Sequence, residues 1–180
     1  MATIRFKTMP LKIGDWTILK LPKSVSAKLP SRGMALVEGT INGFRSKIVL
    51  EPDGKGSHWF VVDSSLRKTA DIDAGDTVTI VVEPSKAWPE PDVPADLNKA
   101  LASDQKANAL WKDITPMARW DWLRWIRSTN NRETRSHRIE VALSKLRSGE
   151  RRPCCFNRNL CTEPEVSKNG ILIEPTQTTK

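Results

Sequence analysis

The sequence predicts an α+β protein with a small closed β-barrel of about six strands, followed by a domain of about four short helices. Three observations predict this fold. Short segments before residue 84 alternate apolar and polar residues. Four prolines then interrupt the chain within eleven residues. From Asp96 onward, apolar residues recur at helical spacing. For the strands, an open sandwich is the alternative architecture.

Six segments are predicted to be strands because they are rich in β-branched and aromatic residues. Between two of them stands Asn42-Gly43, which favours a two-residue hairpin because both turn positions need positive φ. Short turns favour an antiparallel barrel, since closure leaves no exposed edge. The six strands are expected at residues 3–8, 15–21, 35–41, 44–50, 57–62 and 77–83, with a short helical turn at 64–70.

The helices are expected to follow an extended, semi-rigid proline-rich linker, residues 85–95, which Trp88 holds in place. Ser103 is the expected N-cap of the second helix, and Thr115-Pro116 is a strong start signal for the third. Gly149 is the expected end of the fourth helix. The helices are predicted near residues 96–102, 104–114, 116–128 and 133–146.

The domains are therefore expected at residues 1–84 and 96–149, with a tail at 150–180 that is partly disordered, at least from Pro175. All three cysteines, Cys154, Cys155 and Cys161, lie in this tail. Their odd number favours reduced thiols over a disulfide framework. No fourth ligand stands at the usual zinc spacing, so we expect no metal site.

Charge narrows the class of partner without identifying it. The 180 residues contain 29 Lys and Arg against 21 Asp and Glu, a formal charge of +8. Such a charge permits binding to nucleic acid, anionic lipid or an acidic protein. The N-terminal residues show no apolar signal core, and no stretch has the ~18 apolar residues of a spanning helix. We therefore expect a cytoplasmic protein.

Catalytic motifs are missing from the sequence. His58 and His137 belong to separate segments and have no metal-ligand neighbours, and there is no nucleophile elbow or zinc-binding helix motif. Gly54-Lys55-Gly56-Ser57 resembles a phosphate loop, but a strand follows it instead of the helix that would bind phosphate. We expect no catalytic residue and no cofactor.

The strongest functional signal is a basic segment, Arg119–Arg152, with ten Lys or Arg against four Asp or Glu. Arginine suits bidentate recognition of phosphate or carboxylate, and the interleaved Trp residues make a nucleic-acid surface the alternative function. A structural role competes with it: Trp122 and Trp125 share the apolar stripe, and Arg135 and Arg138 are able to pair with carboxylates of neighbouring helices.

The two halves of the chain, up to about Gly149, also resemble a known bacterial family. The strand-rich part is similar to a small β-barrel domain of unknown function in the residues Val37-Glu38-Gly39-Thr40-Ile41-Asn42-Gly43-Phe44, Leu66-Arg67-Lys68 and Gly75-Asp76-Thr77-Val78. The helical part resembles the bacteriocin-protection, YdeI/OmpD-associated domain in Val93-Pro94-Ala95-Asp96-Leu97, Leu123-Arg124-Trp125-Ile126, Glu133-Thr134-Arg135 and Arg138-Ile139.

The resemblance implies association with an outer-membrane porin and protection against bacteriocins or cationic antimicrobial peptides, with no agreed catalytic residues. We therefore expect a non-enzymatic interaction or stress-tolerance protein with a protein partner. A small-anion binder or enzyme, using a cleft between barrel and helices, is a further alternative. The candidate anion or partner contacts are Arg67, Arg124, Arg127, Arg132, Arg135 and Arg138.

Overall fold

The computed structural model describes residues 2–73, 75–153 and 156–177. The chain divides into two units, each of which we describe by itself. The first consists of Met1–Ala87, Arg158–Cys161 and Val166–Lys180, and the second of Trp88–Asn157 and Thr162–Glu165. Strands dominate the first unit and helices the second, which confirms the α+β class.

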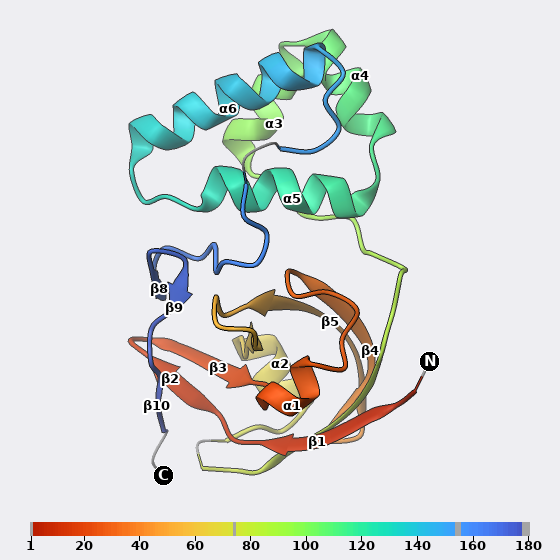
Figure 1. The fold of residues 1–180 in the computed structure, drawn as a ribbon, viewed down its shortest axis with the longest axis vertical. Coiled ribbons are helices and arrows are strands. Elements are labelled where there is room, and N and C mark those ends of the chain that lie inside the picture. The colour runs from red at the N-terminus through yellow and green to blue at the C-terminus, as the bar shows by residue number, and fades with distance from the viewer. Residues whose placement is uncertain (1, 74, 154–155, 178–180) are drawn as a thin grey trace. The chain divides into compact units, whose positions relative to one another are not determined.

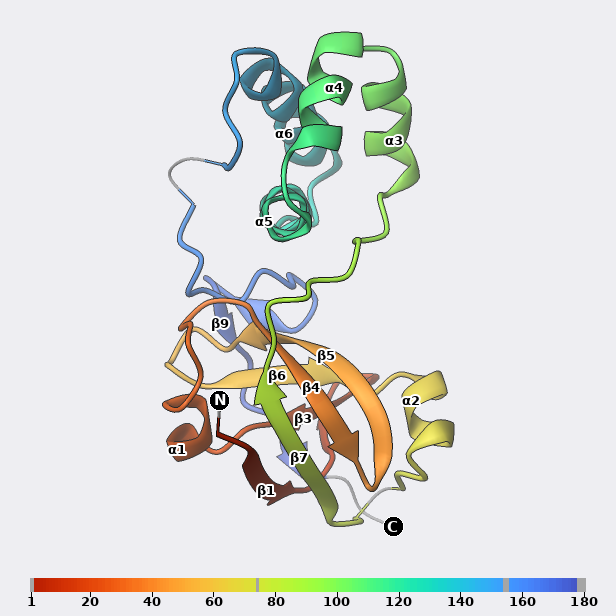
Figure 2. The ribbon, with the colours of Figure 1, turned by 90° about the vertical axis from the view of Figure 1, so that its right-hand side faces the viewer.

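One curled antiparallel sheet forms the first unit (Figures 1 and 2). Its strand order is β1-β7-β4-β5-β6-β3-β2-β10. The strands are β1 (Ile4–Thr8), β2 (Leu11–Ile13), β3 (Trp16–Lys20), β4 (Ala35–Ile41), β5 (Phe44–Pro52), β6 (His58–Val61), β7 (Val78–Pro84) and β10 (Thr176–Gln177). All six predicted strands are present, within two residues of the expected ends.

The predicted closed barrel is wrong, because the sheet is open. Closing six strands would require β3 to pair with β1. In the structure the free edge of β3 pairs with β2 instead, through Ile13 and Trp16. The other edge of β2 pairs with β10 from the tail. A three-residue strand that the sequence did not reveal, together with a tail strand, thus occupies the place where closure would occur.

The hairpin between β4 and β5 forms as predicted. Asn42 and Gly43 have φ angles of 50° and 83°, the left-handed pair that a tight hairpin requires. The Asn42 side chain donates a hydrogen bond to the Ala70 carbonyl at 3.0 Å and accepts one from the Thr79 amide at 2.9 Å. The turn is therefore fixed to the neighbouring loop and to β7 as well as to its own strands.

The concave side of the sheet holds the main core of this unit. Alternate residues of the strands, such as Ile4 and Phe6 in β1 and Ile80 and Val82 in β7, point into it. Two short helices, α1 (Lys23–Ser26) and α2 (Ser64–Thr69), connect strands around it. Val25 of α1 is buried in this core.

Part of the tail folds onto the first unit. The strands β8 (Ser167–Lys168) and β9 (Ile171–Leu172) form a hairpin whose turn, Asn169-Gly170, has φ angles of 54° and 80°. Cys161, Val166 and Leu172 are buried in a second core cluster with Ile13, Ile18 and Trp59. Cys154 and Cys155 lie outside the described residues, as do residues 178–180 of the segment predicted to be disordered.

The second unit contains the four predicted helices (Figure 2). They are α3 (Ala95–Ala102), α4 (Gln105–Asp113), α5 (Pro116–Arg127) and α6 (Arg132–Arg147). Thr115 caps α5 as predicted, and its hydroxyl accepts a hydrogen bond from the Ala118 amide at 3.2 Å. The N-cap of α4 is Asp104 and not Ser103, because the Asp104 carboxylate reaches the Ala107 amide at 3.1 Å while Ser103 ends α3.

The helices enclose a core of their own around Leu97, Trp111, Trp122 and Ile126. Trp122 is fully buried, and its indole N–H donates to the Arg151 carbonyl at 3.0 Å. The segment before α3 is attached to this unit by the ring contact of Trp88 with Trp120, whose centroids are 6.3 Å apart.

Candidate functional site

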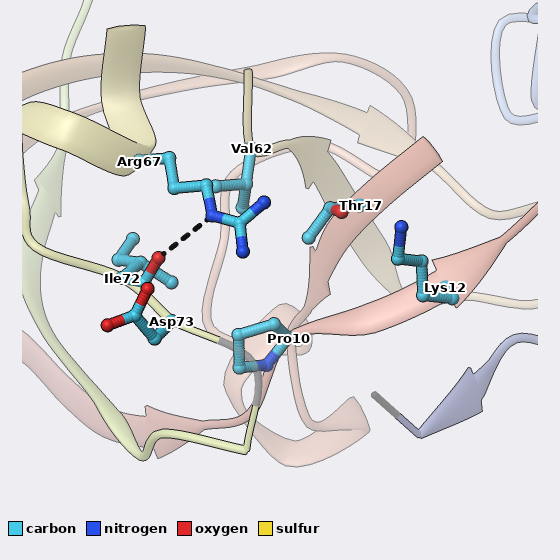
Figure 3. A pocket seen from close by; sticks show the side chains of 7 residues that line it. All are labelled: Pro10, Lys12, Thr17, Val62, Arg67, Ile72 and Asp73. Atoms are coloured by element: carbon cyan, nitrogen blue, oxygen red, sulfur yellow. Dashed lines mark hydrogen bonds between the residues drawn. The ribbon is translucent and has the colours of Figure 1, made fainter. Parts of the chain in front are cut away.

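Arg67 of α2 is held by the residues around it. The Asp63 carboxylate caps α2 by accepting from the Leu66 amide at 2.7 Å. After the helix, Asp71 adopts a φ of 53° and the chain turns back, so that the Ile72 carbonyl accepts from Arg67 Nε at 3.2 Å. This bond occupies the inner nitrogen of the guanidinium and leaves its two terminal nitrogens directed into a hollow (Figure 3).

The hollow is a pocket of about 60 Å³ in the first unit. Lys12 of β2 and Thr17 of β3 are paired in register, which brings both side chains to one side of it. Figure 3 shows the Arg67 guanidinium extending toward Thr17, with Asp73 on the opposite side. The pocket is lined by Pro10, Lys12, Thr17, Val62, Arg67, Ile72 and Asp73.

Cationic groups outnumber anionic ones in this pocket. Lys12 and Arg67 contribute two positive charges, and Asp73 contributes one negative charge. Among the described residues, no ion pair or hydrogen bond occupies the Lys12 ammonium, the terminal nitrogens of Arg67 or the Thr17 hydroxyl. The arrangement therefore offers donors to a small anion. Arg67 is the one predicted contact residue that lies here.

The other five predicted contacts lie in the second unit, where the basic segment is largely paired within the protein. Eight of its ten Lys and Arg residues are within ion-pair distance of a carboxylate. Five of the carboxylates come from outside the segment. The pairs are Arg119–Glu90, Arg124–Asp121, Arg127–Glu163, Arg135–Asp96, Lys145–Glu150, Arg147–Asp104, Arg151–Asp113 and Arg152–Asp121.

Arg135 shows how these pairs join elements. Its Nε and a terminal nitrogen donate to the two oxygens of Asp96 on α3, at 2.7 and 3.1 Å. The hydrogen bond from Arg135 holds the pKa of Asp96 below its usual value, and the hydrogen bond to Asp96 raises the pKa of Arg135. This fork connects α6 to α3 and confirms that Arg135 pairs with a neighbouring helix.

Arg124 and Arg138 take part in the interior of the helical unit. The side chain of Arg124 is fully buried, 3.8 Å from the Asp121 carboxylate, with its guanidinium 5.4 Å from the centre of the Phe156 ring. Arg138 pairs with no carboxylate among the described residues; it donates to the Trp125 carbonyl at 2.8 Å and to the Ser128 hydroxyl at 2.6 Å. Both side chains therefore make their contacts within the helical unit.

Arg127 and Arg132 differ in exposure. Arg127 forms a 2.7 Å ion pair with Glu163, from the short stretch of tail that belongs to this unit. Arg132, in the first turn of α6, is exposed and has no ion pair or hydrogen bond among the described residues. The structure thus does not bring the six predicted contacts together: Arg67 and Arg132 are the most accessible, and they belong to different units.

The two histidines are also separated. His137 is exposed on α6. His58 is fully buried, with Nε2 2.8 Å from the Gly33 carbonyl, and its Nδ1 has no partner among the described residues. Burial lowers the pKa of His58, although the hydrogen bond to Gly33 opposes this shift. Gly54-Lys55-Gly56-Ser57, the segment that resembles a phosphate loop, connects β5 to β6, and in it Asp53 accepts from the Lys55 and Ser57 amides at 2.7 and 2.9 Å.

Sequence reasoning missed Lys12, Thr17 and Asp73. Lys12 lies opposite Thr17 only if residues 11–13 form a strand that pairs with the next one. Three residues are too few to predict a strand from their composition. Among the described residues, no group of three His, Cys, Asp or Glu is placed to bind a metal ion. The described part of the chain also has no helix that is long and apolar enough to span a membrane.

Comparison with known proteins finds a family match in each half of the chain. Residues 2–82, which include β1 to most of β7, match a family described as a domain of unknown function (DUF1905). Residues 90–149, which include α3 to α6, match a family described as bacteriocin-protection, YdeI or OmpD-associated. No curated protein matches the chain.

Proposed function

We infer the function from the family matches: residues 90–149 are similar to the bacteriocin-protection, YdeI or OmpD-associated family, and residues 2–82 to the DUF1905 domain. We propose that it is a non-enzymatic, cytoplasmic bacterial protein that acts in stress tolerance through contacts with a protein partner. The stress in question is exposure to bacteriocins or cationic antimicrobial peptides. The match of the helical unit to that family is the observation that carries the proposal.

The net positive charge of both units indicates that the protein does not bind such cationic peptides itself. The first unit carries 16 basic and 10 acidic residues and the second 13 and 11, so their formal charges are +6 and +2. Both units repel a cationic peptide at long range. Protection therefore depends on a partner with an acidic surface, which the same charge attracts.

Arg132 is the residue that we propose as a contact in the helical unit. Its side chain is exposed. Arg127 and Arg135 form ion pairs, whereas Arg132 forms none within the described part of the chain. The same pairing weakens the case for nucleic-acid binding, because paired arginines release fewer counterions on binding phosphate.

A survival assay tests the proposal. We expect deletion of the gene to lower survival under polymyxin-type peptides and the wild-type gene to restore it. A copy with Arg132→Gln should restore survival less well, whereas Lys99→Gln, an exposed charge on α3, serves as the matched control. Equal survival of deletion and parent strains across several peptides contradicts the proposal, as does saturable binding of the peptide to the purified protein.

A further inference from the structure

We propose that the pocket between α2 and the strands β2 and β3 binds a small oxyanion, either a carboxylate or a tetrahedral group such as phosphate. The residues that would bind it are Arg67, Lys12 and Thr17. This site goes beyond the proposed partner contact. It belongs to the first unit alone and does not depend on the function of the helical domain.

The size of the pocket sets the class of ligand. A cavity needs about 10–15 Å³ of such space to hold one water. The volume of about 60 Å³ thus accommodates roughly four to six heavy atoms, the size of a carboxylate or a phosphate. A nucleotide or a folded peptide is too large for it, although a larger molecule could place one terminal anionic group there.

The available hydrogen-bond donors favour a ligand with a negative charge. Arg67 Nε is already bound to the Ile72 carbonyl, which fixes the plane of the guanidinium and leaves both terminal nitrogens for a fork of two hydrogen bonds. Lys12 adds a second positive charge and Thr17 a hydroxyl donor, from strands whose register is fixed by pairing. The bond to Ile72 lowers the ordering cost of binding for Arg67, and strand pairing fixes the backbone that carries Lys12 and Thr17.

The remaining lining gives the pocket selectivity. Buried Val62 and Ile72 contribute the apolar part of the lining, whereas Arg67, Lys12 and Asp73 are exposed, so an anion reaches the cations directly from solvent. Asp73 faces the cations from the opposite side (Figure 3). Its carboxylate repels an anion that fills the whole pocket, so a small group on the Arg67 side is favoured over a polyanion.

NMR titration of the full chain tests the site. Acetate and inorganic phosphate are added separately, with sodium chloride at matched ionic strength as the reference, while the backbone amides of Lys12, Thr17 and Ile72 are followed. Saturable shifts with acetate or phosphate support the proposal, and the tighter of the two identifies the planar or the tetrahedral group. Shifts that chloride reproduces, or that never saturate, overturn it.

Variants identify the residues responsible. Arg67→Gln and Lys12→Gln should each weaken binding about fivefold, because each removes one charge near the anion. Lys68→Gln, beside Arg67 but outside the pocket lining, should leave it unchanged. Asp73→Asn should tighten binding about threefold. Lys12→Gln remains decisive if Arg67→Gln unfolds the loop at Ile72, and equal losses for Lys12→Gln and Lys68→Gln overturn the site.

Discussion

His58 illustrates how a single buried residue couples folding to pH. Its Nε2 lies 2.8 Å from the Gly33 carbonyl, so Nε2 carries the hydrogen and Nδ1 of the neutral ring is left as an acceptor. Protonation of Nδ1 would place a positive charge in the interior of the unit. Burial therefore holds the pKa of His58 below its ordinary value in the folded chain.

The sign of the pH dependence follows from that shift. The unfolded chain binds a proton at His58 near pH 6.5, and the folded chain binds it only at lower pH, so stability falls as the pH drops below about 6.5. We expect the free energy of unfolding, measured with urea, to fall between pH 7 and pH 5.5 because of this residue. His58→Gln should flatten that part of the curve, and His137→Gln, on an exposed residue, should not. Parallel curves for wild type and His58→Gln exclude this mechanism.

Arginine residues of one sequence segment have different roles. Arg135 binds Asp96 across two helices, Arg124 is buried beside Asp121, and Arg132 is exposed. The sequence supported the pairing of Arg135, because an acidic residue on a neighbouring helix was available. It did not separate Arg124 from Arg132, since burial of an arginine depends on which face of α5 or α6 is covered.

At the scale of elements, local turn chemistry was a reliable guide. Asn42-Gly43 predicted the β4–β5 hairpin, and Asn169-Gly170 in the tail adopts the same left-handed pair of φ angles. The sequence does not predict this second hairpin, because the flanking strands β8 and β9 have two residues each and show no alternation. By contrast, β2 is joined to β3 by the two-residue turn Gly14-Asp15, in which Gly14 has a φ of 56°, but its three residues are too few to show a strand pattern.

Gly39 and Gly43 belong to the same hairpin, but glycine is required at the two positions for different reasons. One position has no room for a Cβ, and the other needs a positive φ. A Cβ at Gly39 of β4 would lie 2.0 Å from the Val81 carbonyl of β7, where both backbones are fixed by pairing. A Cβ at Gly43 meets nothing within 4 Å, so that position requires only the positive φ. Gly39→Ala should therefore lower the free energy of unfolding by about 3 kcal/mol. Gly43→Ala should lower it by about 1 kcal/mol. Equal losses in chemical denaturation contradict this distinction.

At the scale of the whole molecule, the tail completes the first unit. Leu172 is 5% exposed and lies in the cluster around Trp59, and its amide donates to the Asp53 carbonyl at 2.9 Å. Residues more than a hundred positions apart thus share one core. The tail would not form this hairpin alone, since isolated two-stranded hairpins are marginally stable in water.

Neighbouring tail residues provide the test. Leu172→Ala should destabilise the protein by about 3 kcal/mol, because it leaves a cavity in a buried cluster. Ile171→Ala, at a side chain that is 38% exposed, should cost below about 1 kcal/mol. Urea denaturation followed by Trp fluorescence reports the change. If both variants unfold at the wild-type midpoint, the tail does not contribute to the core.

The sequence by itself determined the α+β class, six strands, four helices and most of their ends. These depend on periodicity, caps and turns, whose physics acts over a few residues. The tertiary structure decided that the sheet stays open, that acidic residues from outside the basic segment pair with its arginines, and that Lys12 and Thr17 meet Arg67 at one pocket. Strand pairs, ion pairs and the pocket lining bring together residues that are far apart in the chain. Their interaction energies depend on distances between these residues, and only the folded structure sets those distances.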